Sequence, residues 1–122
     1  MAILERAHRG AIEEQYAHEL WLAHGLHRQS PMVVLLRGLA ATYAIDTAPP
    51  GPIELGGAGW GVYPDYRAAI RRLLDDDARV LVSASALDRL GMSDKRLLPG
   101  LGVSEDHEIT KLLIIAERIL FL

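Results

Sequence analysis

Residues Ala78–Met92, ARVLVSASALDRLGM, contain the pattern that decides the fold. Arg79–Val82 is a short apolar run typical of a buried strand, and Ala84–Leu90 has the pattern of one or two helical turns closed by Gly91. Ser83 therefore lies at the carboxyl end of a strand, just before a helix. In an open α/β sheet ligands collect at this position, and the free amides of a helix N-terminus favour an anion there.

Further strands and helices are predicted on either side of this stretch. The predicted strands are Ala2–Glu5, Met32–Leu36 and Ile119–Leu122, and the predicted longer helices are Ala11–His27, Asp65–Asp75 and Glu105–Ala116. Leu97–Val103, which is split by Pro99-Gly100, allows at most a short additional strand. Strands that alternate with helices favour a parallel sheet with helices on both faces. We therefore expect one α/β domain over residues 1–122, with three layers (α/β/α) and a mostly parallel sheet of four or five strands.

Residues 82–92 read VSASALDRLGM, in which Ser83 follows the strand and a Leu, a charged pair and a Gly-Met pair follow in turn. This order resembles the DsrE/DsrF/DsrH family of small sulfur-relay proteins, and specifically its DsrF (TusC) branch, with Ser83 at the position of the family's cysteine. The resemblance extends over Ala2–Gly38 and from Glu105 to the last strand, whereas Thr47–Gly61 departs in length and composition. It implies a DsrE-like fold and a protein that assembles into dimers, trimers or hexamers. It also implies sulfur transfer between cysteines.

Ser83 changes the chemistry that the resemblance implies. The chain contains no cysteine, and a serine hydroxyl cannot carry a persulfide, which forms on a thiolate. No G-x-S-x-G motif surrounds Ser83 and no triad partner stands at a recognisable position, so no catalytic residue is assigned. The structural alternative is a helix cap, and Ser85 to Asp88 has the spacing of a capping box. Ser83, Ser85 and Gly38, which ends the predicted strand Met32–Leu36, are candidate ligand-binding residues at the sheet edge.

Residues Thr47–Gly61 include three prolines and five glycines, and we expect them to form a long irregular loop. The glycine-rich part lacks the Lys-Ser/Thr pair of a phosphate-binding loop and does not directly follow a strand. A flap is therefore favoured over a phosphate cradle. If the flap closes over Ser83 and Gly38, Trp60 and Tyr63 are the expected aromatic contacts of a ligand.

Four histidines, His8, His18, His24 and His27, lie near one another in the sequence. His24 and His27 are three residues apart and Glu14 and His18 are four apart, which are spacings that metal ligands on a helix use. His18 and His27 fall about half a turn apart on the helical wheel, so the histidines do not converge on one site. We expect solvated surface histidines, and neither a metal nor a cofactor is assigned.

Composition bears on partners and location. Half of the 122 residues are hydrophobic, and the net charge is −3. The acidic balance argues against nucleic-acid binding. Because no long apolar run or signal sequence is present, we expect no membrane contact and a cytoplasmic protein. So many apolar residues in a small domain favour a homo-oligomer, and Trp21, Ile114 and Ile115, which fall outside the inner faces of their helices, are the candidate interface residues.

Three classes of function remain open. The leading hypothesis is a non-catalytic or divergent DsrE/DsrF-like protein that acts as an interaction or assembly subunit, with a sulfur-relay protein as a candidate partner. The alternative is a small ligand-binding or enzymatic α/β domain that uses the Ser83 sheet edge and the flap 51–61. A weaker third option is a metal-responsive protein that uses the histidines.

Overall fold

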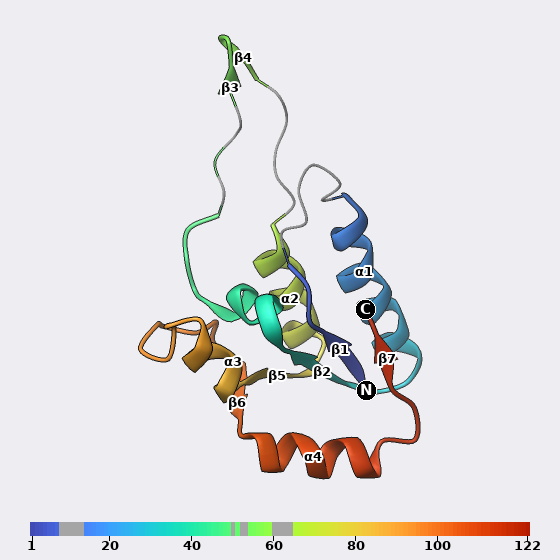
Figure 1. Ribbon diagram of the computed structural model, residues 1–122. Helices are drawn as coiled ribbons and strands as arrows, with labels where there is room; N and C mark the ends of the chain where they lie inside the picture. Colours follow the sequence, from blue (N-terminus) through green and yellow to red (C-terminus); the bar gives the residue numbers. More distant parts are fainter. Residues whose placement is uncertain (8–13, 50, 52–53, 60–64) are drawn as a thin grey trace.

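The computed structural model describes residues 1–7, 14–49, 51, 54–59 and 65–122, and Figure 1 shows their arrangement. The strands are β1 (Ala2–Leu4), β2 (Val33–Leu36), β3 (Glu54–Leu55), β4 (Ala58–Gly59), β5 (Arg79–Ser83), β6 (Gly102–Ser104) and β7 (Leu120–Phe121). The helices are α1 (Glu14–Gln29), α2 (Tyr66–Asp75), α3 (Ala84–Arg89) and α4 (Asp106–Ile115), together with the 3-10 helix η1 (Gly38–Ala44).

Five strands form one parallel sheet in the order β6-β5-β2-β1-β7. The two central strands, VVLL in β2 and RVLVS in β5, are almost entirely buried because helices cover both faces of a parallel sheet. The predicted α/β fold with a parallel sheet of four or five strands is confirmed. The fifth strand is β6, which lies at the end of the segment predicted to allow a short strand.

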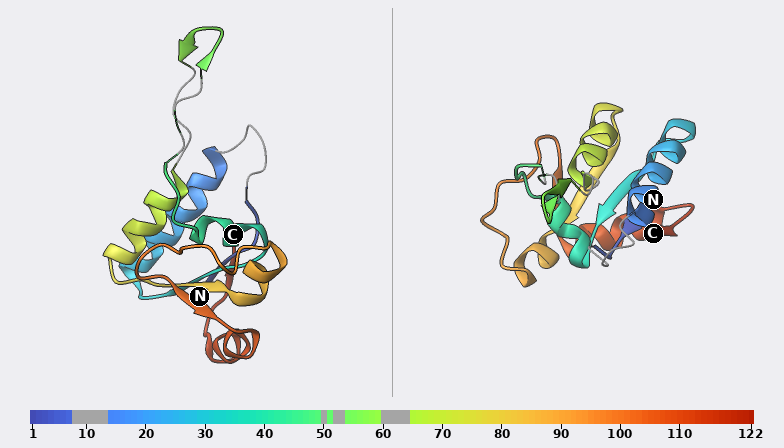
Figure 2. Two further views of the ribbon diagram at one scale, coloured as in Figure 1. Left: turned by 90° about the vertical axis from the view of Figure 1, so that its left-hand side faces the viewer. Right: turned by 90° about the horizontal axis from the view of Figure 1, so that it is seen from above.

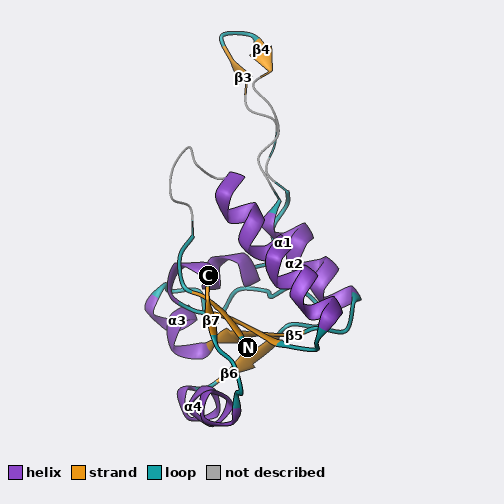
Figure 3. Cartoon of the chain, turned by 90° about the vertical axis from the view of Figure 1, so that its right-hand side faces the viewer, coloured by secondary structure: helices purple, strands orange, loops and turns teal. Residues whose placement is uncertain are grey.

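Helices cover both faces of the sheet, and Figure 3 shows α4 on one side with α1, α2 and α3 on the other. On the α1 side, Leu4, Leu36 and Val82 belong to the larger core. On the opposite side, Ile109 of α4 packs with Ile3, Leu35 and Leu81. Neighbouring strand residues thus alternate between the two cores, as the strand pleat requires. No helix within the described ranges is both long and apolar enough to cross a membrane.

Helix α2 illustrates why the sequence forms its elements where it does. Tyr66, Ile70 and Leu73 are buried at helical spacing. The Asp65 carboxylate caps the helix by accepting from the backbone N–H groups of Arg67 and Ala68 at 3.0 and 3.2 Å. Figure 2 shows α1 and α2 side by side above the sheet.

The segment predicted to be an irregular loop contains a short hairpin. Strands β3 and β4 pair in antiparallel register, with Leu55 opposite Ala58. The turn between them is Gly56-Gly57, with φ of 61° and 79°. Two successive positive φ values match the right-handed twist of a hairpin, and glycine adopts them without steric cost. In Figure 1 this hairpin stands away from the sheet.

Candidate functional site

The carboxyl ends of β1, β2 and β5 meet at one edge of the sheet because the strands are parallel and in register. Glu5 and Arg6 follow β1, Arg37 and Gly38 follow β2, and Ser83 ends β5. The structure therefore brings Gly38 and Ser83 to the same sheet edge. In open α/β sheets this edge is the usual place for a ligand.

Ser83 itself is buried, with 1% of its surface exposed. Its Oγ accepts a hydrogen bond from the backbone N–H of Ala86 at 3.2 Å, so Ser83 is the N-cap of α3. The structural alternative for Ser83, a helix cap, is therefore confirmed. The capping-box spacing from Ser85 to Asp88 does not mark the helix start, because the chain already has helical geometry at Ala84.

A chain of hydrogen bonds continues from Ser83 across the sheet edge. Ser83 Oγ lies 3.0 Å from Ser85 Oγ, and Ser85 Oγ donates to the Asp106 carboxylate at 2.8 Å. Since Ser85 has one hydroxyl proton and gives it to Asp106, the Ser83 hydroxyl is the donor to Ser85. The network fastens α3 to the first turn of α4. No histidine or lysine among the described residues is hydrogen-bonded to Ser83.

Gly38 has a structural role at this edge. Its φ is +51°, and a β-carbon added there would stand 2.7 Å from the carbonyl oxygen of Glu5. The chain can leave β2 this close to the end of β1 only because residue 38 has no side chain. The backbone N–H of Arg37 donates to the Leu4 carbonyl at 2.7 Å and keeps the two strand ends together.

A cavity of about 520 Å³ opens beside Gly38. Three arginines line it: Arg6 after β1, Arg37 after β2, and Arg89 at the end of α3. These three arginines were not predicted as a group because they are far apart in the chain. Arg6 and Arg37 come just after β1 and β2, and this position is a signal that the sequence offers, whereas Arg89 ends the helix that starts at the carboxyl end of β5.

At the neighbouring edge strand, Ser104 ends β6 and the N-cap of α4 is Glu105. The Glu108 carboxylate accepts from the backbone N–H of Glu105 at 3.0 Å and from the Ser104 hydroxyl at 3.2 Å. Both hydrogen bonds stabilise the ionised form of Glu108 and therefore lower its pKa below the ordinary value. The bond from the Glu105 backbone has the larger effect, and the bond from the Ser104 hydroxyl has the smaller one.

The remaining sequence candidates for ligand binding fall elsewhere. Trp60 and Tyr63 lie outside the described residues, as does His8, and nothing is described of the His18 and Glu14 side chains. The closing of the flap over Ser83 and Gly38 thus stays a prediction.

His24 and His27 both form hydrogen bonds to Asp76, the residue that follows α2. His24 Nε2 lies 2.6 Å from the Asp76 carboxylate, and His27 Nε2 donates to the Asp76 carbonyl at 2.9 Å. The backbone N–H of Met32 donates to His27 Nδ1 at 3.2 Å. The two side chains therefore fasten the end of α1 to the end of α2. The described residues include no group of three His, Asp or Glu side chains that could hold a metal ion.

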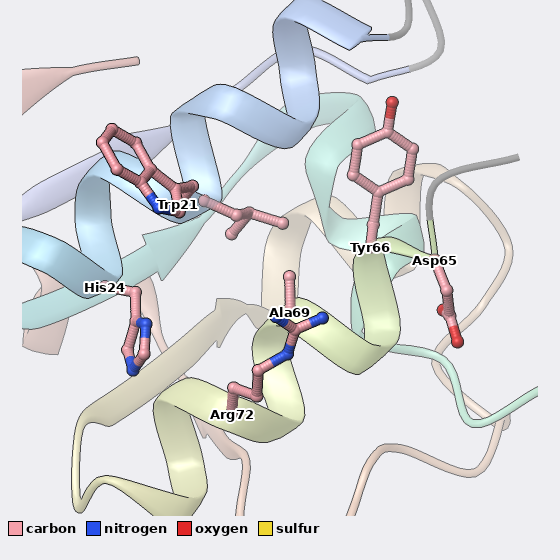
Figure 4. A pocket seen from close by; sticks show the side chains of 7 residues that line it. Trp21, His24, Asp65, Tyr66, Ala69 and Arg72 are labelled. Carbon is pink, nitrogen blue, oxygen red and sulfur yellow. The ribbon is translucent and has the colours of Figure 1, made fainter.

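Trp21 stands beside a shallow groove between α1 and α2, shown in Figure 4. Its side chain is 72% exposed. The groove measures about 290 Å³, and Arg72 reaches into it from α2 while the carboxylate of Asp65 points away from it. Trp21 is thus a surface residue on the α1 side of the sheet.

Ile114 and Ile115 are exposed on the opposite side of the sheet, at 77% and 74%. Three further apolar residues are exposed at and beside β7, after the exposed charged residues Glu117 and Arg118. The five apolar residues are here called the C-terminal apolar surface: Ile114, Ile115, Ile119, Leu120 and Phe121. Strand β7 is one of the two outer strands of the five-stranded sheet, and its neighbour among the described strands is β1. The three candidate interface residues therefore form two separate surfaces rather than one.

Comparison with known proteins identifies the fold. No family model matches the sequence, and no curated protein matches it significantly. Among solved structures, the YchN protein of E. coli is similar, with a TM-score of 0.77 over 99% of this chain and 97% of that chain. The fold is DsrE-like. The two sequences are 19% identical, and a likeness at this level establishes the fold alone.

Proposed function

We propose that this chain is a divergent protein of the DsrE/DsrF type that acts as an assembly subunit in the cytoplasm and carries no persulfide itself. The resemblance of residues 82–92 to the DsrF (TusC) pattern supports the sulfur-relay connection. The hydroxyl at the cysteine position supports the non-catalytic role, because Ser83 is buried and engaged as a helix cap.

The observation that carries the assembly role is the C-terminal apolar surface. Five large apolar side chains between residues 114 and 121 are exposed, two at the end of α4 and three at and beside the outer strand β7. Burying such side chains against a partner stabilises the complex through the hydrophobic effect. An outer strand also offers unpaired backbone groups to a second chain. The occupant proposed here is a second copy of this chain.

Sedimentation velocity at tens of micromolar tests this role. The unmodified protein is expected to sediment as a dimer or trimer. Ile115→Glu should shift it to a monomer, because a charge in an apolar contact is costly. Thr110→Glu is the control, since it adds the same charge at an exposed polar position of the same helix. Trp21→Glu tests the candidate interface residue on the other side of the sheet. A monomeric unmodified protein, or equal disruption by Thr110→Glu and Ile115→Glu, would contradict the proposal.

A separate measurement tests the proposal that the protein carries no persulfide. Intact mass after incubation with a persulfide donor should be unchanged, because no thiolate is present to accept sulfur. A stable gain of one sulfur atom would overturn the non-catalytic role without affecting the assembly proposal.

A further inference from the structure

The cavity at the carboxyl edge of the sheet carries a local positive charge. Three arginines and one carboxylate, Glu5, line it, so its formal charge is +2, whereas the whole chain has a net charge of −3. A positive cavity in an acidic protein is a local feature that the overall composition does not explain. Its place beside the ends of β1 and β2 is also where parallel sheets bind ligands.

Each arginine retains donors for a ligand. Arg89 donates from Nε to the Ser85 carbonyl at 3.1 Å and from Nη2 to Ser85 Oγ at 3.4 Å, which fixes its guanidinium and leaves other N–H groups available. Arg37 Nη1 lies 3.4 Å from Glu5 Oε1 in a partly exposed, and therefore weak, ion pair. Arg6 has no ion-pair partner among the described residues.

The rest of the cavity is apolar or has no side chain. Leu39, Ala86 and Leu90 line it, and Leu39 is 54% exposed. Gly38 contributes only backbone. A ligand that matches these walls has a planar anionic group for the guanidinium groups and an apolar body for the leucines.

We infer that this cavity binds a small organic anion, whose carboxylate or similar oxyanion group lies among Arg6, Arg37 and Arg89 and whose apolar part lies against Leu39 and Leu90. Guanidinium groups match carboxylates through paired hydrogen bonds, which are stronger than those between neutral groups. Glu5 competes with the ligand for Arg37. The inference goes beyond the assembly role and does not depend on it, because a monomer has the complete cavity.

The test adds three small molecules to the full chain and monitors their binding through the backbone amide signals in NMR spectra. Benzoate has both the anionic and the apolar part, sulfate has the anionic part alone, and benzamide is the neutral analogue. Benzoate is expected to move the amide signals of Gly38, Leu39 and Leu90 at millimolar concentration. Sulfate should bind more weakly, and benzamide should leave these signals in place.

Variants distinguish benzoate binding in this cavity from nonspecific electrostatic attraction to the protein surface. Arg37→Gln and Arg89→Gln should each weaken benzoate binding about tenfold, as expected for loss of a charged hydrogen bond. Glu5→Gln should strengthen it, since the competing carboxylate is gone. Arg79→Gln is the matched control, because Arg79 is an exposed arginine at the amino end of β5.

Three results would overturn the inference: no benzoate response, a response confined to signals outside this cavity, or equal loss in Arg79→Gln and Arg89→Gln. Arg89 is an exposed residue at the end of α3. Its variant thus keeps the test decisive if Arg37→Gln fails to fold. An oligomer that binds no benzoate would refute this inference and leave the assembly proposal standing.

Discussion

Ser83 and Ser104 are register partners at the ends of β5 and β6, but the helices that follow them leave toward opposite faces of the sheet. The Ser83 hydroxyl caps α3, and the Ser104 hydroxyl donates to Glu108 in α4. Both side chains are buried. The edge where open α/β sheets usually bind ligands is thus occupied here by two helix starts, which favours a structural role for Ser83.

Replacing Ser83 by alanine should therefore destabilise the protein. Loss of the cap leaves the Ala86 N–H without its acceptor, at a cost of about 1 kcal/mol in the free energy of unfolding. The loss in the free energy of unfolding is measured by urea denaturation, monitored by circular dichroism. Ser93→Ala is the control, because Ser93 is exposed and its replacement should have little effect. Equal effects of the two variants would contradict the capping role.

A cysteine introduced at position 83 should be protected from thiol reagents. Ser83 is 1% exposed, whereas Ser85 is partly exposed in the same hydrogen-bonded chain. Labelling of Ser83→Cys is thus expected to be at least about tenfold slower than labelling of Ser85→Cys, since reaction requires access to the sulfur. Similar rates would show that the sheet edge opens readily in solution.

Two glycines should respond to alanine in opposite directions. Gly38→Ala places a β-carbon 2.7 Å from the Glu5 carbonyl oxygen at a φ of +51°, and should lower the free energy of unfolding by about 1–3 kcal/mol. Gly25→Ala, inside α1 with no atom within 4 Å of the new carbon, should raise it by about 0.5–1 kcal/mol. Chemical denaturation of both variants measures the difference. A tolerated alanine at position 38 would contradict the close approach of β1 and β2.

Glu108 should make stability depend on acid pH. Its folded-state pKa is lowered by the Glu105 N–H and the Ser104 hydroxyl. Its contribution to the free energy of unfolding is therefore complete above the ordinary glutamate pKa. The contribution is lost as pH falls through the lowered value. The stability difference between the unmodified protein and Glu108→Gln should therefore shrink between neutral and strongly acidic pH. A difference that is the same at every pH would exclude this coupling.

Local sequence patterns predicted most elements of the fold. The apolar runs at Val33–Leu36 and Arg79–Ser83, and the helical spacing of Tyr66, Ile70 and Leu73, depend on side chains close in the chain. The hairpin at Gly56-Gly57 was missed because the run of glycines and prolines suggested only irregularity. The cap at Ser83 was predicted from its place before the helix, whereas the capping-box spacing at Ser85 was misleading because both serines fit the local pattern.

By itself, the sequence determined the α/β class and the parallel sheet, since these follow from periodicity, and it contains no cysteine, the residue on which a persulfide forms. Only the tertiary structure decided which residues share a site. Arg6, Arg37 and Arg89 meet because β1 and β2 are in register and α3 follows the next strand. Trp21 and Ile114 are separated because their helices cover opposite faces of the sheet. Strand order and the face each helix covers are long-range choices, set by burial of both sheet faces, and no local pattern encodes them.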